Sequence, residues 1–374
     1  MHALPLLDRR RLATVIAERP QVALRIADGE FVGAVVPFGR WSHDFRFVGK
    51  DALVQRIRIR AHGIAASGPR FAAPLGAGFV AAEHDPKLSP KLCAVQFAVA
   101  IVSPPTYLYS EAFREMAEAL HYALLALGHD SLLTDRLDYD DRQTIVLGSN
   151  LLAHYGLEPP KNAILYNFEQ VYEGSPWLTP ALLDLFRRYP VWDYSQANVE
   201  RLAAWHVPQL THVRVGYVPE LTRIAAVPED IDVLFYGSNS PRRRAVLDAL
   251  RARGFRVEWL FGVFGAGRDA MIARSKIVLN MHLYEAEVFE IVRVSYLLAN
   301  GRAIVSERGS NPAEDADLTS GIVFAAYDEL VDRCVEVLGD DRTRRELGQR
   351  GYQAFSARSQ VDILGEILSP SLDR

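Results

Sequence analysis

The residues best suited to chemistry stand where a predicted strand passes into a predicted helix. The apolar run 231–236 predicts a buried strand, and a helix is expected to begin near Pro241. The start of a helix presents unpaired N–H groups and the positive end of the helix dipole, so it can bind an anion. The turn between strand and helix supplies three candidate binding residues, Gly237, Ser238 and Asn239.

Arginines in the first turn of this helix strengthen the case for an anion. Ser240 is a suitable N-cap and Pro241 a suitable first helical residue, and Arg242, Arg243 and Arg244 follow. Cations are unfavourable at a helix N-terminus unless an anion balances them, and guanidinium groups bind phosphate oxygens well. We therefore predict that Arg242 and Arg243 bind the diphosphate of a nucleotide sugar. The alternative is an ordinary turn with exposed arginines.

A second polar cluster follows a later predicted strand that ends at Asn280, itself a candidate binding residue. His282 could bind a phosphate oxygen or the sugar. Glu287 or Glu285 could accept hydrogen bonds from both ribose hydroxyls, because an ionised carboxylate only accepts, and Glu287 is also a candidate catalytic residue. The alternative for the loop as a whole is a solvated turn.

Arg293 lies on the next predicted helix, 289–299. It could reach the donor phosphate, or it could simply pair with Glu290 three residues before it.

Two further positions complete the candidate site. Gly262, at the end of the predicted strand 256–261, would let the backbone approach a ligand beside phenylalanines that could stack on a base or pack in the core. Glu169, in the polar run after the predicted strand 163–166, is the candidate base for deprotonating an acceptor hydroxyl. The alternative for Glu169 is an internal network that caps the next helix. No residue is assigned to a metal.

Alternating strands and helices must position these residues. From Val95 onward, short strands alternate with helices, which predicts parallel, doubly wound sheets. We expect an α/β fold with two Rossmann-like domains, residues 95–218 and 219–374, that face a cleft at the carboxyl ends of their strands. The last helix, near 361–368, could cross back to the first domain. Residues 1–94, with turn signals and the alternating run 54–60, indicate a small β-containing appendage and linker.

Composition narrows the class of protein. The chain has 374 residues, of which 49% are apolar and 24% are charged, as expected of a globular protein. A net charge of −4 without a long basic run argues against nucleic acid as the main partner. We predict no signal peptide and no membrane span, and hence a cytoplasmic protein. Cys93 and Cys334 lie far apart and indicate neither a disulfide framework nor a zinc site.

At this point residues 95–374 resemble a GT-B glycosyltransferase, of a group 1 or GT4-like bacterial branch. The motifs that carry the resemblance are Gly237-Ser238 with Arg242-Arg243, Asn280-Met281-His282, Arg293, Ala299-Asn300-Gly301, Tyr166–Gln170 and Val191–Ser195. The resemblance implies a hexosyltransferase-like enzyme without a cofactor or metal, which takes a nucleoside-diphosphate sugar and an unidentified acceptor. That acceptor could be a glycan, a lipid, a small molecule or a protein. Residues 1–94 lie outside the resemblance and could bind a protein acceptor, form a homodimer interface or shape the acceptor site.

One departure from the family pattern keeps other readings open. Retaining enzymes of the commonest type carry two glutamates here, but the second position falls on Tyr296 and the first near Val288, beside Glu287. The stereochemical outcome is therefore not predicted. The broken pair also fits a non-catalytic module that binds a nucleotide or glycan in assembly or regulation. A nicotinamide oxidoreductase fits poorly, because Ser103-Pro104-Pro105 replaces the expected Gly-x-Gly-x-x-Gly.

Overall fold

The computed structural model describes residues 23–27, 30–35, 42–48, 54–60, 95–284 and 286–369. The chain divides into two compact units, Met1–Lys87 and Leu88–Arg374. In the first unit, β1 (Ala23–Ala27) pairs antiparallel with β2 (Glu30–Val35), and β3 (Ser42–Val48) with β4 (Val54–Arg60), which confirms the strand predicted over 54–60. The turn signals within residues 1–94, which are Asp28-Gly29 and Gly39-Arg40, lie outside the described residues, as do Cys93 and Glu285.

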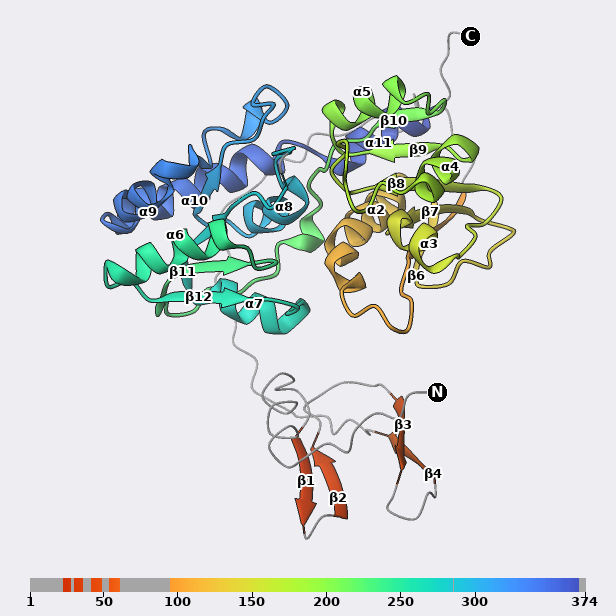
Figure 1. The fold of residues 1–374 in the computed structure, drawn as a ribbon, viewed down its shortest axis with the longest axis horizontal. Coiled ribbons are helices and arrows are strands. Elements are labelled where there is room, and N and C mark those ends of the chain that lie inside the picture. Colours follow the sequence, from red (N-terminus) through yellow and green to blue (C-terminus); the bar gives the residue numbers. More distant parts are fainter. Residues whose placement is uncertain are drawn as a thin grey trace, which may run out of the picture. The chain divides into compact units, whose positions relative to one another are not determined.

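The second unit begins with a parallel sheet of six strands in the order β10-β9-β8-β7-β5-β6 (Figure 1). Its strands are β5 (Gln96–Ile101), β6 (Asp130–Thr134), β7 (Gln143–Leu147), β8 (Ala163–Asn167), β9 (Val191–Asp193) and β10 (Leu210–His212). The intervening helices are η1 (Ser110–Phe113), α2 (Arg114–Ala126), α3 (Ser149–Tyr155), α4 (Pro180–Arg188) and α5 (Gln196–Ala204). Residues 97–101 are buried on both faces of β5, which explains why this strand is a continuous apolar run.

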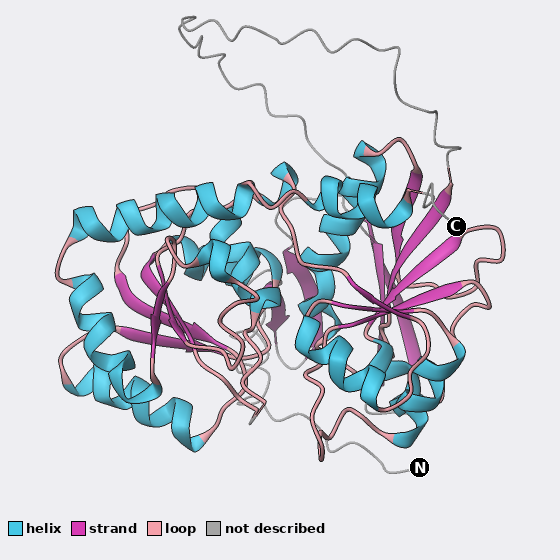
Figure 2. Cartoon of the chain, turned by 90° about the horizontal axis from the view of Figure 1, so that it is seen from above, coloured by secondary structure: helices cyan, strands magenta, loops and turns pink. Residues whose placement is uncertain are grey.

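A parallel sheet of five strands follows in the order β12-β11-β13-β14-β15. Its strands are β11 (Ile231–Tyr236), β12 (Val257–Leu260), β13 (Ser275–Asn280), β14 (Ile304–Glu307) and β15 (Val323–Ala325). The other elements are η2 (Pro219–Leu221), α6 (Pro241–Ala252), α7 (Gly265–Ala273), α8 (Ile291–Ala299), η3 (Ala316–Leu318), η4 (Tyr327–Glu329), α9 (Leu330–Leu338), α10 (Asp341–Ser356) and α11 (Gln360–Leu368). Figure 2 shows helices on both faces of each sheet. No described helix is long and apolar enough to cross a membrane.

The chain passes between the two sheets twice, and the two passages lie side by side. Tyr217 and Ser359 form a parallel β-bridge, and the Gly216 amide donates to Oε1 of Gln360 at 2.7 Å. A Cβ on Gly216 would lie 2.8 Å from the carbonyl oxygen of Arg358, so only glycine permits this approach. After the second passage, α11 packs against α2 of the first domain.

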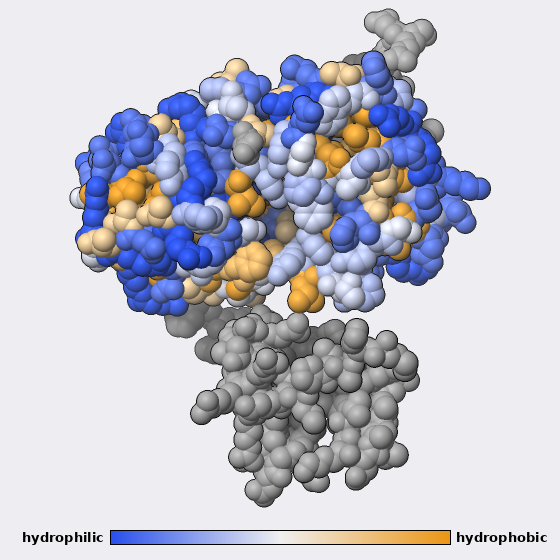
Figure 3. All heavy atoms as spheres, viewed as in Figure 1, coloured by the Kyte–Doolittle hydropathy of each residue, from blue (hydrophilic) through white to orange (hydrophobic). Residues whose placement is uncertain are grey.

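The predicted fold class is confirmed. Each sheet is parallel and doubly wound, so Leu88–Arg374 holds two Rossmann-like domains, the arrangement called GT-B. Figure 3 shows a hollow between the two lobes. The carboxyl ends of the strands in both sheets supply the loops that meet there, and these loops carry most of the predicted site residues.

Candidate functional site

The turn after β11 has the helix start that the sequence predicts. α6 begins at Pro241, and Oγ of Ser240 accepts a hydrogen bond from the Arg243 amide at 3.3 Å. Gly237 has a φ of +146°, which residues with side chains rarely adopt. A Cβ on Gly237 would lie 3.1 Å from Nη2 of Arg293 and 3.5 Å from Nη1 of Arg243. Glycine therefore lets the turn approach two guanidinium groups.

Arg243 and Arg293 form a pair of cations without an ion-pairing carboxylate among the described residues. Arg243 is only 2% exposed and donates to the carbonyl of Ser238 at 2.9 Å, while its buried Nε has no partner. Arg293 donates to Oδ1 of Asn280 at 2.8 Å. None of the ion pairs in the described part of the chain involves either arginine. Burial, and then the neighbouring Arg293 charge, lowers the pKa of Arg243 to about 10.

Asn280 and His282 support this pair from the interior. The Asn280 side chain holds Arg293 through Oδ1 and donates from Nδ2 to Glu290 at 3.0 Å. Nδ1 of His282 lies 3.1 Å from Oε2 of Glu290, and Nε2 lies 3.0 Å from the Arg308 carbonyl. Burial lowers the pKa of His282, but Glu290 and that carbonyl outweigh it, so the pKa is raised. Both ring nitrogens therefore already have protein partners, and the alternative pairing of Glu290 with Arg293 is not formed.

Arg242 is engaged differently from its neighbour. Its guanidinium forms a bidentate ion pair with Glu307, with Nη1 2.7 Å from Oε2, and lies 4.1 Å from the centre of the Tyr327 ring. Glu307 also accepts the His282 amide at 2.9 Å, so Arg242 braces the loop after β13. Of the two arginines predicted for the diphosphate, Arg243 is the one that adjoins Gly237.

Asn239 and Gly262 lie at the edges of the site. Asn239 is exposed and lines a surface recess with Trp259 and residues of α6. Gly262 has a φ of +67°, and a Cβ there would lie 3.2 Å from Cε1 of Tyr109. Phe261 packs against the same tyrosine, with ring centres 5.3 Å apart. The loop after β12 thus contacts the loop after β5 in the first domain.

The two candidate catalytic glutamates lie on loops that are bonded to each other. Gln170, directly after Glu169, donates to the Val288 carbonyl at 2.9 Å and accepts the Val288 amide at 3.3 Å. Val288 directly follows Glu287, whose φ of +49° places a non-glycine residue in the left-handed region. The Glu287 side chain is exposed. The structure thus brings both glutamates to the junction of the domains.

The carboxyl group of Glu169 is poised to exchange a proton near neutral pH. It accepts one hydrogen bond, from Nδ2 of Asn150 at 3.0 Å, and burial raises its pKa from 4.5 to about 7. The side chain of Asn167 bonds both the Glu169 amide, at 3.2 Å, and the Glu169 carbonyl, at 2.9 Å. Asn198 donates to the same carbonyl at 3.1 Å. Three hydrogen bonds with these two asparagines therefore fix the backbone of Glu169.

Sequence reasoning missed what holds these asparagines. The carboxylate of Asp193 is fully buried and accepts from Asn167 at 2.6 Å and from Asn198 at 3.0 Å. Burial raises the pKa of Asp193 to about 7. The motif Val191–Ser195 indicated that this segment matters. The sequence could not show that Asp193 contacts Asn167, because that contact forms only when β8 and β9 pair in the sheet.

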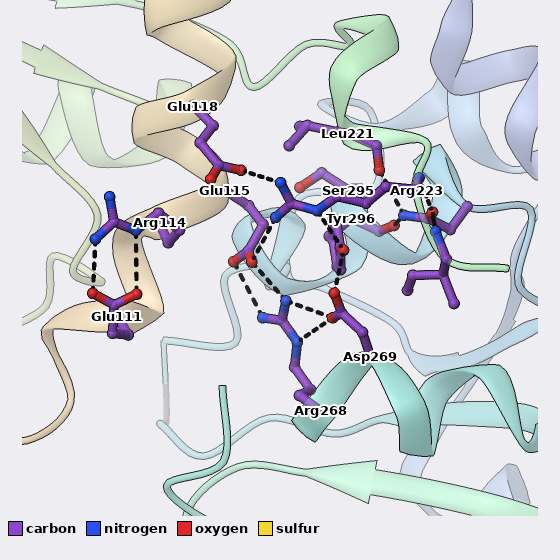
Figure 4. A network of polar contacts seen from close by, with 12 residues as sticks. Glu111, Arg114, Glu115, Glu118, Leu221, Arg223, Arg268, Asp269, Ser295 and Tyr296 are labelled. Carbon is purple, nitrogen blue, oxygen red and sulfur yellow. Dashed lines mark hydrogen bonds and ion pairs between the residues drawn. The ribbon is translucent and has the colours of Figure 1, made fainter. Parts of the chain in front are cut away.

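A charged network joins the two domains beside the site (Figure 4). Glu115 on α2 accepts two hydrogen bonds from Arg268 on α7, at 2.6 and 3.1 Å. Arg268 also bonds Asp269 at 3.0 Å, and the Tyr296 hydroxyl donates to that carboxylate at 2.8 Å. Arg223 donates to the same hydroxyl at 3.0 Å. Tyr296 is therefore a partner in the contact between the domains.

No group of three or more His, Cys, Asp or Glu side chains within the described residues is arranged to hold a metal ion.

Proteins of a giant virus are similar to this chain in sequence. Uncharacterized protein L140 of Acanthamoeba polyphaga mimivirus is 28% identical over 271 residues, which cover 67% of this chain and 84% of L140. Uncharacterized protein L138 of the same virus is 34% identical over 114 residues, but the match spans only 13% of L138. No protein-family model matches the chain. Because these relatives are viral, the bacterial branch stays a prediction.

Solved structures of similar fold are glycosyltransferases. AviGT4, a glycosyltransferase of avilamycin A biosynthesis, has a TM-score of 0.48 and 17% identity, covering 73% of this chain and 96% of AviGT4. HepE from Anabaena, in complex with UDP and glucose, has a TM-score of 0.47 and 12% identity, covering 73% of this chain and 98% of HepE.

Proposed function

We propose that this chain is a glycosyltransferase that moves a sugar from a nucleoside-diphosphate sugar to a hydroxyl group of an acceptor. The observation that carries the proposal is the pair Arg243 and Arg293 beside the Gly237 turn. Two guanidinium groups without an ion-pairing carboxylate in the described chain, next to a helix start, favour a ligand with several negative oxygens. A diphosphate supplies such oxygens on adjacent phosphorus atoms.

The proposed chemistry uses this positive charge at the step where negative charge grows. The bond between the anomeric carbon and the diphosphate oxygen breaks, and its electron pair stays on the diphosphate. Arg243, Arg293 and the start of α6 offset that charge, a form of stabilisation that is usually the largest single contribution in such reactions. Because these cations serve the leaving group, we propose that the transfer needs no metal.

Glu169 is the proposed base for the acceptor. A hydroxyl oxygen of the acceptor attacks the anomeric carbon and gives its proton to the Glu169 carboxylate. A pKa of about 7 leaves a large share of this group ionised at neutral pH and still basic enough to take a proton. Glu287, on the adjoining loop, is proposed to contact the donor. Contacts between the domains, such as Gln170 with Val288, would exclude water that hydrolyses the donor.

A non-catalytic module is the second candidate, and one observation favours it. Tyr296 occupies the position where the family resemblance expects a glutamate, and its hydroxyl is engaged with Arg223 and Asp269. A nucleotide could then bind at Arg243 and Arg293 without being turned over.

One experiment separates the two candidates. The full chain is incubated with UDP-, GDP-, dTDP- and ADP-sugars, with and without EDTA, and release of the nucleoside diphosphate is followed. A glycosyltransferase should release one diphosphate slowly by hydrolysis, unaffected by EDTA, and Arg293→Gln should slow release at least tenfold. Arg253→Gln, at the opposite end of α6, is the matched control and should match the unaltered protein. Binding without any release would favour the module.

A further inference from the structure

Partly exposed aromatic side chains lie on the loop that carries Glu169 and on neighbouring segments, of which α3 and the loop after β13 hydrogen-bond to that loop. They have no part in the proposed donor site. They come from four separate segments: the loop after β5, the end of α3, the loop after β8 and the loop after β13. We call them the aromatic rim, which consists of Tyr107, Tyr155, Tyr172, Trp177 and Tyr284. Such rings at one place are costly to leave in water, so a ligand that covers them gains apolar contact.

The members of the aromatic rim are connected with one another across the two domains. Nε1 of Trp177 donates to the Tyr284 hydroxyl at 3.2 Å, and the Tyr172 and Tyr284 rings lie 5.9 Å apart. Thr106 donates to the Tyr155 hydroxyl at 3.4 Å, next to Tyr107 in sequence. Burial, and then the charge of Glu169, raises the pKa of Tyr107 to about 12, so this hydroxyl remains a hydrogen-bond donor at all ordinary pH values.

Tyr284 ties the aromatic rim to the donor site. Burial raises its pKa, the charge of Glu169 raises it further, and the charge of Arg243 lowers it. Tyr284 also contacts Trp177, on the loop that carries Glu169, and shares its own loop with Met281, whose carbonyl accepts a hydrogen bond from Arg243. A molecule on the aromatic rim would be next to the donor sugar, as an acceptor must be.

The surroundings of Glu169 disfavour an anionic group where the acceptor meets this carboxyl. Glu169 accepts a hydrogen bond from the neutral side chain of Asn150, and among the described residues it forms no ion pair with a basic side chain. Burial raises the pKa of Glu169, in keeping with that environment. A phosphate or carboxylate on the ligand would thus face a carboxylate without a counter-ion, which is unfavourable in a partly buried site. The acceptor should be neutral where it meets Glu169.

From these observations we infer that the acceptor is a neutral carbohydrate bound on the aromatic rim, with the attacking hydroxyl at Glu169. The inference rests on the proposed transferase function and names its acceptor class. A pyranose has faces of C–H groups that pack on the negative faces of aromatic rings, and hydroxyls around its edge. Tyrosine hydroxyls and the Glu169 carboxylate match those edge hydroxyls. A lipid chain would use the rings but leave these polar groups unpaired.

The test measures acceptor binding separately from donor binding. The full chain is screened on a glycan array, and hits are measured by calorimetry with and without the nucleoside diphosphate that binds best. Farnesyl phosphate and a serine- and threonine-containing peptide library are the competing acceptors. We expect a neutral glycan to bind and to accelerate release of the diphosphate from the donor. Binding only of the phosphate lipid or only of peptides, or of nothing on the array, would overturn the inference.

Variants connect the result to these residues. Trp177→Ala should weaken glycan binding about tenfold, while Trp177→Phe, which keeps a ring, should retain most of it. Tyr107→Phe removes one hydroxyl and should weaken binding with no effect on nucleotide affinity. Tyr189→Phe, at the C-terminal end of α4 and outside the aromatic rim, is the control and should change neither. If glycans bind but no nucleotide does, the proposed transferase function is wrong, while the aromatic rim remains a glycan site. If nucleotides bind but glycans do not, the inference about the aromatic rim is wrong, while the proposed function is retained.

Discussion

Replacing Glu115 by alanine should destabilise the two-domain unit markedly, because this carboxylate joins the domains from within. Glu115 accepts hydrogen bonds from two nitrogens of Arg268 at 2.6 and 3.1 Å, and both side chains are only 6% exposed. Figure 4 shows the pair at the centre of the network. In its absence the Arg268 charge would stay buried with fewer partners.

The expected magnitude follows from the partners that remain. Removing one member of a buried ion pair costs roughly 3–5 kcal/mol. Arg268 keeps Asp269 at 3.0 Å and the Tyr296 ring at 4.7 Å, so Glu115→Ala should cost about 3 kcal/mol, at the low end of that range. In Arg268→Ala, Glu115 keeps Arg223 at 3.5 Å, and a similar cost of about 2–3 kcal/mol is expected. The double variant should cost less than the sum, with a coupling of about 2 kcal/mol.

Urea unfolding of the full chain, followed by circular dichroism, measures these costs. Glu111→Ala is the matched control, since Glu111 pairs with Arg114 at 2.8 Å in the same region but is 51% exposed. An exposed pair of this kind contributes about 0.5 kcal/mol. The slope of the unfolding free energy against urea concentration should be the same for all of these variants. A changed slope would mean that unfolding is not two-state and that the free energies cannot be compared. Equal effects of Glu115→Ala and Glu111→Ala, with additive double variants, would refute a buried bridge between the domains.

Three further outcomes are expected. Gly237→Ala should cost about 1–3 kcal/mol in unfolding experiments and weaken nucleotide binding, because its φ is +146° and the new Cβ would lie 3.1 Å from Arg293; an unchanged affinity would contradict this reading. The rate of sugar transfer should rise with pH through about 7, and Glu169→Gln should abolish this rise; a rise that persists would exclude Glu169 as the base. The pKa of Asp193 is about 7 in the folded protein against an ordinary value of 3.8, so its contribution to stability is complete below 3.8 and lost as pH rises to about 7. Asp193→Asn should flatten that fall, measured as unfolding free energy against pH; parallel curves for both proteins would refute it.

The main elements of the fold could be read from the sequence because their signals are local. The strand predicted over 231–236 is β11, because its residues are mostly apolar and four of the six are buried. β9 and β10 were not predicted, because each has only three residues, which is too short for an apolar pattern to be recognised. α8 begins at Ile291, two residues after the predicted start at Phe289, since no capping side chain marks its beginning.

The candidate site was predictable only where it is local. The Gly237 turn and the Ser240 cap lie within a few residues of each other. A glycine, an N-cap serine and a proline at the first helical position predict them from the local sequence. The different fates of Arg242 and Arg243 were not predictable, because Glu307, the partner of Arg242, lies 65 residues away. The same holds for the bond between Gln170 and Val288, which are 118 residues apart.

Calorimetric titration of the full chain with UDP, GDP, dTDP and ADP, and with the matching monophosphates, tests the central claim most directly. The account predicts that one diphosphate binds more tightly than its monophosphate. Arg243→Gln and Arg293→Gln should each weaken the diphosphate at least tenfold, and Arg253→Gln should not. A folded protein that binds none of the diphosphates, or binds one with an affinity that neither variant changes, would contradict the assignment of these two arginines to a diphosphate.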